Sequence, residues 1–259
     1  MTSGLSEFGE TAPEGPPGQN LRAYGLRRSR QLHDELTFGQ QKLNALFRDS
    51  QRHTFKPAEL LGTANGWSDG IYYLRAGWAS QFRHLGDGLR AIVDVYLPGD
   101  VIGLDRILRL RPLEDVLTLT SVTIEAIPVE DALVELMTDQ QIVLYLVWLL
   151  GRRQQRTDRL LAAISCLDAR GRLAMMMLDF FTRLRRRKLI TGSMYNLPLT
   201  QVQIGQYLGL TVVHINRVLR ALRDAEIANL EKHCVTIIDL GRLTRLAHGH
   251  SKFVDCVHQ

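Results

Sequence analysis

Residues 199–222 read LTQVQIGQYLGLTVVHINRVLRAL, which is the pattern of two short helices joined by a tight turn. Thr200, two residues after Pro198, can cap the start of a first helix, and Gly209 can end that helix because glycine adopts the left-handed backbone conformation without strain. Thr211 is placed to cap a second helix. The spacing predicts a helix-turn-helix, although a bare helix–glycine–helix pattern also fits an ordinary helical hairpin with a solvated basic face.

The apolar residues of this stretch follow the period of a helix, so we expect them to be buried. In the first helix they are Val202, Ile204, Tyr207 and Leu208, and in the second they are Ile215, Val218, Leu219 and Leu222. The exposed faces of the second helix then carry Val213, His214, Asn216, Arg217 and Arg220.

The stretch from 200 to 220 resembles the helix-turn-helix of the Crp/Fnr family of bacterial transcription regulators. The residues in register are Leu199, Thr200, Ile204, Gly205, Leu208, Gly209, Thr211, Ile215, Asn216, Arg217 and Leu219. The resemblance implies that the second helix reads bases in the major groove, and it assigns DNA contacts to Thr200, Gln201, Thr211, Val212, Val213, His214, Asn216, Arg217 and Arg220.

One position departs from the family pattern. Val213 stands where the family usually has a glutamate, so we expect the half-site to differ from the family's TGA-like core. Arg217 matches the arginine that bonds a guanine, whereas Gln201, Thr211 and Arg220 are expected at phosphates.

Composition sets broad limits on the protein. A chain of 259 residues with 45% hydrophobic content can bury two cores, so we expect two domains. The net charge of +5 suits a polyanionic partner, but an excess of this size is also usual for a solvated surface.

No apolar run is long enough for a membrane span, and the first residues lack a secretory signal pattern, which predicts a cytoplasmic protein. The three cysteines are scattered, and we expect free thiols.

The N-terminal region is predicted to contain a disordered tail followed by a helix. Residues 1–25 are rich in Gly, Pro, Ser and Glu, which predicts a disordered tail without the cysteine cluster that iron-sulfur sensors of the family carry near this end. A short leading helix is expected next, with apolar positions at Leu32, Leu36, Leu43, Leu46 and Phe47. It begins the domain predicted over residues 26–135.

Residues 52–129 contain short apolar runs separated by Gly, Pro and Asp, which is typical of an antiparallel β-sandwich or barrel. Residues 72–77 (YYLRAG) and 97–103 (LPGDVIG) resemble strands and turns of the family's β-roll. In members that bind a cyclic nucleotide, a Gly-Glu pair and an Arg-Ser or Arg-Thr pair follow.

This chain departs from the cyclic-nucleotide cassette at both pairs. Leu104 and Asp105 follow Gly103, and the later loop reads LRPLED over residues 110–115, so Glu114 and Asp115 would repel a phosphate. The residues left for an effector pocket are Gly103, Leu104, Asp105 and Arg111. We expect cyclic nucleotides not to bind.

Residues 130–167 return to a helical period, with a long helix over 136–167 that resembles the family's dimerisation helix. Two apolar stripes run along it, which implies two partners, although a simple buried helix would also fit. We assign the dimer interface to Ile142, Leu146, Leu149, Arg153, Arg156, Leu160 and Ala163, and the second stripe holds Val143, Val147, Leu150, Leu161 and Ile164.

The remaining residues, 168–259, are predicted to form a winged helix-turn-helix domain. A helix over 170–184, a wing over 232–240 and a final helix from about Arg242 complete it. The basic segment 183–188 either touches phosphates or is simply solvated. The predicted fold is thus α+β: an N-terminal double-stranded β-helix (a jelly-roll-like β-roll), a long dimerisation helix and a C-terminal winged helix-turn-helix.

The function expected from the resemblance is transcription regulation. The protein should bind double-stranded DNA at a palindromic promoter site as a homodimer and contact RNA polymerase, with no membrane partner. No catalytic motif or metal-ligand spacing is visible, so we expect neither enzyme activity nor a cofactor or metal. Two alternatives remain open: a small-molecule sensor of the same fold, and an interaction module that has lost DNA binding.

Overall fold

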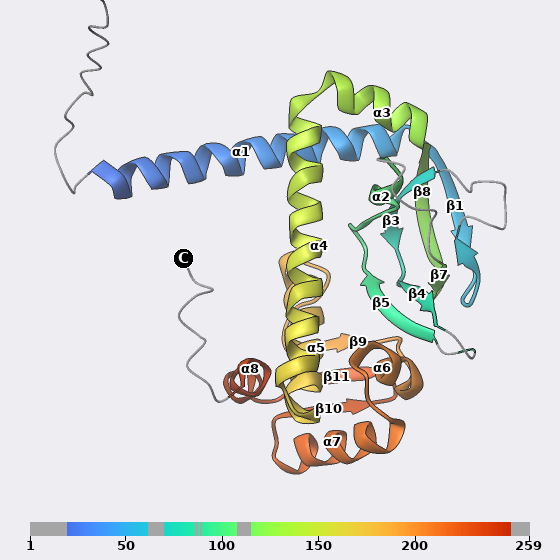
Figure 1. Ribbon diagram of the computed structural model, residues 1–259, viewed down its shortest axis with the longest axis vertical. Helices are drawn as coiled ribbons and strands as arrows, with labels where there is room; N and C mark the ends of the chain where they lie inside the picture. Colours follow the sequence, from blue (N-terminus) through green and yellow to red (C-terminus); the bar gives the residue numbers. More distant parts are fainter. Residues whose placement is uncertain (1–19, 62–69, 86–87, 89, 108–114, 250–259) are drawn as a thin grey trace, which may run out of the picture.

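The computed structural model describes residues 20–61, 70–85, 88, 90–107 and 115–249, and for residues 20–30 it describes only the backbone. The predicted tail over residues 1–19 lies outside the described residues, and so do Arg111 of the expected effector pocket and Cys256. Figure 1 shows an N-terminal β-sheet domain and a C-terminal helical domain, both lying along one long vertical helix.

Two antiparallel four-stranded sheets make up the N-terminal domain, which we define as residues 51–138. Their strand orders are β1-β8-β3-β6 and β2-β7-β4-β5. The strands are β1 (Gln51–Phe55), β2 (Leu60–Leu61), β3 (Gly70–Ala76), β4 (Ala79–His84), β5 (Arg90–Tyr96), β6 (Val101–Ile102), β7 (Val116–Thr118) and β8 (Val122–Pro128), with the one-turn helix α2 (Leu104–Ile107) after β6. The predicted β-roll is confirmed.

The turn between β3 and β4 depends on a glycine. Gly77 has φ of 87°, and a Cβ at this position would lie 2.1 Å from the carbonyl oxygen of Ser121. Any larger residue would push the turn away from the loop before β8. Tyr72, Leu74 and Ile102 then fill the space between the two sheets.

The segment with a helical period, residues 130–167, is broken at Asp139, so the long helix begins at Gln140 and not at residue 136 as predicted. α3 spans Val129–Thr138 and α4 spans Gln140–Cys166, at an angle of 116° to each other. Asp139 causes the break, because its carboxylate accepts hydrogen bonds from the backbone N–H of Gln141 (2.9 Å) and of Ile142 (3.2 Å) and so starts a new helix. Within the described part of the chain, none of the helices taken singly has the length and hydrophobicity of a membrane span.

The leading helix is longer than expected. α1 spans Asn20–Arg48, so residues 20–25, which were assigned to the tail, belong to it. After Pro17 the next proline is Pro57, and nothing in the backbone therefore prevents the helix from extending back to Asn20. α1 crosses the N-terminal end of α4 (Figure 1).

The C-terminal domain, which we define as residues 168–249, is a winged helix-turn-helix, as predicted. Its elements are α5 (Ala169–Arg186), β9 (Met194–Asn196), α6 (Gln201–Leu208), α7 (Val212–Asp224), β10 (Ala228–Glu231), β11 (Cys234–Ile237) and α8 (Leu240–His248). The three strands form one sheet in the order β10-β11-β9. The chain passes from α4 to α5 at Leu167 and Asp168, where the C-terminal domain was predicted to begin.

The two domains nevertheless share one hydrophobic core. Trp78, Phe82, Ile92, Val95 and Leu97, from the β4–β5 face and the turn after it, are buried against α5 and α6 of the C-terminal domain. The ring of Trp78 lies edge-on to that of Phe180, with centroids 5.5 Å apart. The interdomain contact is therefore packed like a protein interior.

Candidate nucleic-acid interface

Local hydrogen bonds fix the helix-turn-helix. The hydroxyl of Thr200 accepts from the backbone N–H of Gln203 (3.2 Å), and the Gln203 side chain accepts from the backbone N–H of Thr200 (2.9 Å), so α6 begins with a capping box. Gly209 ends α6 with φ of 65°, and Thr211 caps α7 by accepting from the backbone N–H of His214 (3.3 Å). Both caps and the glycine turn were predicted.

The helix α7 divides into two faces. Ile215, Val218 and Leu222 are buried in the shared core, and Leu219 packs against that core. On α6 the predicted apolar face is confirmed for Ile204, Tyr207 and Leu208, but the prediction for Val202 was wrong: its side chain is 57% exposed, because it lies on the outer side of the first turn. The residues expected at DNA are all exposed: Thr200, Gln201, Thr211, Val212, Val213, His214, Asn216, Arg217 and Arg220.

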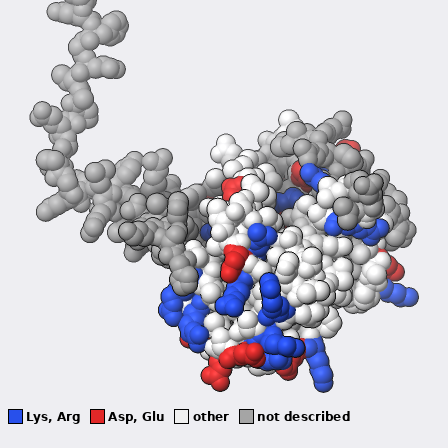
Figure 2. Space-filling model, turned by 60° about the horizontal axis from the view of Figure 1, so that its bottom comes forward, with Lys and Arg blue, Asp and Glu red and all other residues white. Residues whose placement is uncertain are grey.

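The exposed face of α7 carries positive charge. Within the described residues neither Arg217 nor Arg220 has a carboxylate partner, and α7 holds no acidic residue before Asp224. Figure 2, which brings the end of the molecule with the helix-turn-helix forward, shows Lys and Arg side chains around this end and a smaller acidic group at its rim. The face has the charge that attracts a phosphate backbone.

Arg217 borders a cleft that the sequence did not reveal. The cleft has a volume of about 310 Å³ between α7 and the start of α5, and it is lined by Asp168, Ala169, Arg170, Arg217, Val218 and Ala221. Arg170 therefore joins the basic face from a separate helix. Nothing in the sequence spacing placed it near Arg217.

The two stripes of α4 have different surroundings. In the predicted interface stripe, Ile142, Leu146 and Ala163 are buried, Leu149 and Leu160 pack against cores of their own chain, and Arg153 and Arg156 are largely covered. Side chains buried in their own subunit leave little surface for a partner, so this stripe is the one that packs inward. In the other stripe Val143, Val147, Leu150 and Leu161 are exposed, by 36%, 59%, 37% and 64%.

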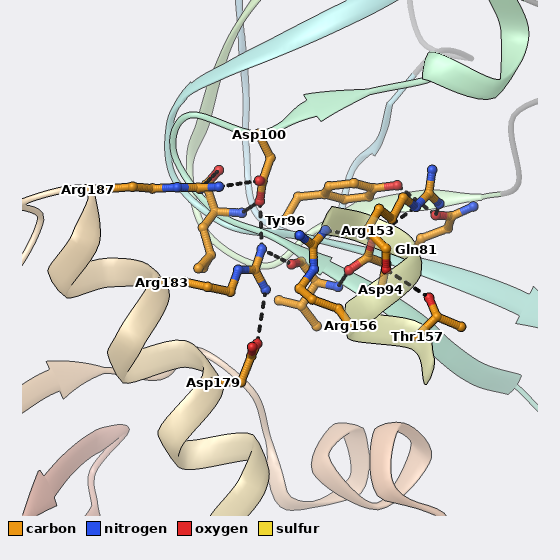
Figure 3. A network of polar contacts seen from close by, with 12 residues as sticks. Gln81, Asp94, Tyr96, Asp100, Arg153, Arg156, Thr157, Asp179, Arg183 and Arg187 are labelled. Carbon is orange, nitrogen blue, oxygen red and sulfur yellow. Dashed lines mark hydrogen bonds and ion pairs between the residues drawn. The ribbon is translucent and has the colours of Figure 1, made fainter. Parts of the chain in front are cut away.

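The predicted interface arginines instead tie α4 to the N-terminal domain. Arg153 donates to the Gln81 side-chain oxygen (2.6 Å) and pairs with Asp94 (3.2 Å), and Arg156 pairs with the same carboxylate (3.6 Å). The Tyr96 hydroxyl donates to the same Gln81 oxygen (2.7 Å). Figure 3 shows these side chains converging between α4 and the β4–β5 strands.

A second cluster joins the N-terminal domain to α5. Asp100, in the turn after β5, accepts from Arg183 (2.7 Å), from Arg187 and from the backbone N–H of Leu97 (2.8 Å). Arg183 also donates to the Val95 carbonyl (2.9 Å) and lies 3.6 Å from Asp179. The side chains of Arg183 and Asp100 are only 7% and 8% exposed, so this is a buried ion pair between domains (Figure 3).

Electrostatics at Asp100 favour the charged form. Burial alone would raise the pKa of this carboxyl, but the charges of Arg183 and Arg187 and the hydrogen bond from Arg187 outweigh it and hold the pKa well below its ordinary value of 3.8. For Arg183, burial would lower the pKa, but Asp100 and Asp179 raise it. Arg183 therefore neither touches a phosphate nor lies in solvent, the two roles that the sequence had left open for it.

The expected effector pocket is only partly described. Gly103 has φ of 87° and leads into α2, where Leu104 is buried and Asp105 half-buried. Arg106 is also buried and donates to the Gly70 carbonyl (3.3 Å). Among the described residues, no group of three His, Cys, Asp or Glu side chains could hold a metal ion.

Two protein-family models match the chain. The cyclic nucleotide-binding domain matches residues 52–139, and the Crp-like helix-turn-helix domain matches residues 171–246. These segments correspond to the two structural domains, and the long helix α4 lies between them.

Similar proteins include several regulators. The chain is 26% identical over 218 residues to the anaerobic regulatory protein of Haemophilus influenzae, covering 83% of this chain and 84% of that protein. It is 28% identical over 186 residues to the fumarate and nitrate reduction regulatory protein of Vibrio cholerae, covering 70% and 72%. Among solved structures, FixK2 from Bradyrhizobium japonicum has a TM-score of 0.66 at 21% identity, covering 78% of this chain and 99% of that one, which shows a shared fold.

Proposed function

The chain belongs to the Crp/Fnr family of DNA-binding transcription regulators, and from this premise we propose that it binds a two-fold symmetric promoter site as a homodimer, without control by cyclic nucleotide. The observation that carries the proposal is the exposed face of α7. Val213, Asn216, Arg217 and Arg220 project from a helix that the Thr211 cap and the shared core hold in place. A partner such as RNA polymerase would meet this complex on the promoter.

Base reading falls mainly to Arg217. Its guanidinium can bond a guanine in the major groove in a bidentate manner, which is worth about 1–3 kcal/mol of discrimination. Val213 has no acceptor for a cytosine amino group, so His214, Asn216 or apolar contact of Val212 and Val213 with a thymine methyl would read the neighbouring base. Gln201, Thr211 and Arg220 would contact phosphates, and Thr200 would lie beside them at the start of α6.

The homodimer would form along the exposed stripe of α4. Val143, Val147, Leu150 and Leu161 lie on one side of the helix, and a groove of about 560 Å³ runs beside them, lined by Val147, Leu150, Gly151, Arg153, Gln154 and Thr157. An apolar stripe on an exposed helix is the usual seam of a helix pair. Both α7 helices must face one duplex, so the two α4 helices would run parallel.

Independence from cyclic nucleotide follows from the side chains between α4 and the β-roll. Arg153 and Arg156 already join α4 to Asp94 and Gln81, a connection that an effector would otherwise have to make. Leu104 and Asp105 replace the Gly-Glu pair of the cyclic-nucleotide cassette, and Glu114 and Asp115 stand in the segment where the Arg-Ser or Arg-Thr pair is expected, so their negative charges oppose a phosphate. If the protein is instead a small-molecule sensor of the same fold, its ligand would have to differ chemically from a cyclic nucleotide.

The test combines selection and sedimentation. The full chain is used to select a duplex from a random pool, and the molecular mass of the resulting protein–DNA complex is then measured by analytical ultracentrifugation. We expect an inverted repeat with half-sites about 34 Å apart and two chains per duplex. Val147→Arg should give monomers that bind the duplex weakly, whereas Ile238→Arg, at a residue with 54% exposure, should remain a dimer. One chain per duplex, or no selected motif at all, would contradict the proposal.

A further inference from the structure

Arginines gather where α4 passes α5, on the side of α4 opposite to its exposed apolar stripe. In Figure 1 α5 lies behind the lower part of α4, and the two helices contact each other. Arg152 and Arg159 are about two turns apart on α4 and so share a face, whereas Leu161 of the apolar stripe is about two and a half turns from Arg152 and points the opposite way. A subunit packed on the apolar stripe would therefore leave the arginine face open.

Arg186, the last residue of α5, approaches the two arginines of α4 from the second helix. Burial lowers the pKa of the Arg152 guanidinium below its ordinary value of 12.5, and the nearby charges of Arg186 and Arg159 lower it further. Asp179 acts in the opposite direction, but it already lies 3.6 Å from Arg183. We name Arg152, Arg159 and Arg186 the outer arginines. Their mutual repulsion costs free energy that a bound anion would recover.

The acidic side chains near the outer arginines have other partners. Asp94 and Asp100 pair with the arginines between the domains (Figure 3). Asp158, which is exposed on α4, accepts from Gln154 (2.8 Å). In the part of the chain that the structure describes, none of the outer arginines forms an ion pair, and the buried Nε–H of Arg156 beside them has no acceptor. Donors therefore outnumber acceptors where α4 meets α5.

An aromatic residue holds Arg152 in place. Trp148 lies one turn before Arg152 on α4 and is 41% exposed. Its ring stacks on that of Tyr145, with centroids 5.6 Å apart, and the centre of the Arg152 guanidinium is also 5.6 Å from it. A guanidinium in such a cation–π contact keeps its N–H groups free for hydrogen bonds. Arg152 is thus positioned for an acceptor that its own chain does not supply.

The number and spacing of the charges favour an oligophosphate. Arg152 and Arg159 are about 10 Å apart along α4, with Arg186 beside them on α5. A phosphate monoester carries about 1.5–2 negative charges and three acceptor oxygens, and arginine can bond it in a bidentate manner. Two linked phosphates can therefore compensate three arginines, whereas an acidic protein would have to place three separate carboxylates in the same small area.

DNA on the helix-turn-helix fits the outer arginines less well. Arg152 lies about 21 Å along α4 from the end of that helix at Cys166, and α7 lies beyond this end (Figure 1). A straight duplex on the exposed face of α7 would not reach Arg152. A small ligand has no such restriction.

We propose that the outer arginines bind a small ligand with two or more linked phosphate groups, such as a nucleoside di- or triphosphate. The ligand would contact both α4 and α5. Because Arg153 joins α4 to Asp94 of the N-terminal domain (3.2 Å) and α5 belongs to the C-terminal domain, the ligand would stabilise the arrangement of the two domains. The site needs neither a second subunit nor DNA, so it does not depend on the function proposed above.

Calorimetry of the full chain with inorganic tripolyphosphate tests the proposal. We expect micromolar binding of one tripolyphosphate per chain. Arg152→Gln and Arg186→Gln should each weaken this binding more than about ten-fold, because each removes a charge-assisted contact. Arg48→Gln is the matched control, since Arg48 is exposed at the end of α1, and it should bind as the wild type does. The altered side chains lie at the surface of the subunit, and circular dichroism should show unchanged folding.

Tryptophan fluorescence determines where the ligand binds, because the exposed face of α7 also carries arginines. Tripolyphosphate should change the emission of the wild-type protein, and Trp148→Phe should remove this change while calorimetry still detects binding. A fluorescence change that persists in Trp148→Phe would overturn the assignment to this site. No binding to the wild type, or equal weakening by Arg48→Gln and Arg152→Gln, would overturn the proposal. So would an Arg152→Gln variant that binds tripolyphosphate normally but has lost affinity for DNA or for an acidic protein.

Discussion

Asp100→Asn tests the ion pair between the domains. The substitution keeps the size of the side chain and removes the charge that Arg183 and Arg187 face. Arg183 would then stay 7% exposed, and Asp179, at 3.6 Å, would be its one remaining carboxylate partner within the described part of the chain. Leaving a buried charge without its close partner costs about 3–5 kcal/mol, and we expect the free energy of unfolding to fall by the lower part of that range because Asp179 remains.

Urea unfolding followed by circular dichroism measures the change. Asp158→Asn is the control, since Asp158 is exposed on α4 and, among the described residues, accepts only from Gln154 (2.8 Å), and it should change the free energy of unfolding by less than about 0.5 kcal/mol. Combining Asp100→Asn with Arg183→Met removes both charges. The free energy of unfolding of the double variant should therefore fall by less than the sum of the decreases in the two single variants. Additive losses would refute the buried pair as the cause.

The same variant has an expected pH dependence. The folded pKa of Asp100 lies below its unfolded value, so the stability that the carboxylate contributes is complete above the unfolded value of 3.8 and is lost as the pH falls towards the folded pKa. Between pH 7 and pH 3 the difference between wild type and Asp100→Asn should therefore shrink by about 1 kcal/mol. A difference that is constant or grows on acidification would refute the reasoning.

Three further outcomes are expected. Arg217→Ala should relax the selected motif at one position per half-site and cost about 1–3 kcal/mol on the preferred duplex; recovery of an equally sharp motif by wild type and variant would show that Arg217 reads no base. Cyclic AMP and cyclic GMP should give no binding heat in calorimetry and no change in DNA affinity, and micromolar binding of either would contradict the proposed independence. Gly205→Ala should destabilise the chain by about 1–3 kcal/mol in urea, because the new Cβ would lie 2.4 Å from the Leu210 carbonyl oxygen, while Gly241→Ala, whose nearest contact is an ordinary 3.4 Å, should be neutral or stabilising.

The helix-turn-helix was predictable because its signals are short-range. Thr200, Gly209 and Thr211 each act on backbone groups within three or four residues, so their roles can be read without knowing the fold. The break at Asp139 is equally local, since Asp139 caps α4 through the N–H groups that follow it. It was missed because the helical period continues on both sides of the break.

The interdomain pairs could not be predicted in the same way. Asp100 and Arg183 are 83 positions apart, and nothing local distinguishes Arg183 from its exposed neighbours Arg185 and Arg186. The two stripes of α4 were visible as periodicities, but a period does not say which face turns inward. That choice depends on α1 and the β-roll packing beside Ile142 and Leu146, which is a tertiary effect.

The core shared by the two domains restricts how this regulator can change shape. A rotation of the helix-turn-helix away from the β-roll would bring Trp78, Phe82 and Val95 into contact with water and would break a buried ion pair in the same step. Packed cores have few alternative arrangements, so such a motion would be all-or-none rather than gradual. An input acting on this protein would therefore change the fraction of molecules competent for DNA, and each molecule would be either fully engaged or fully released.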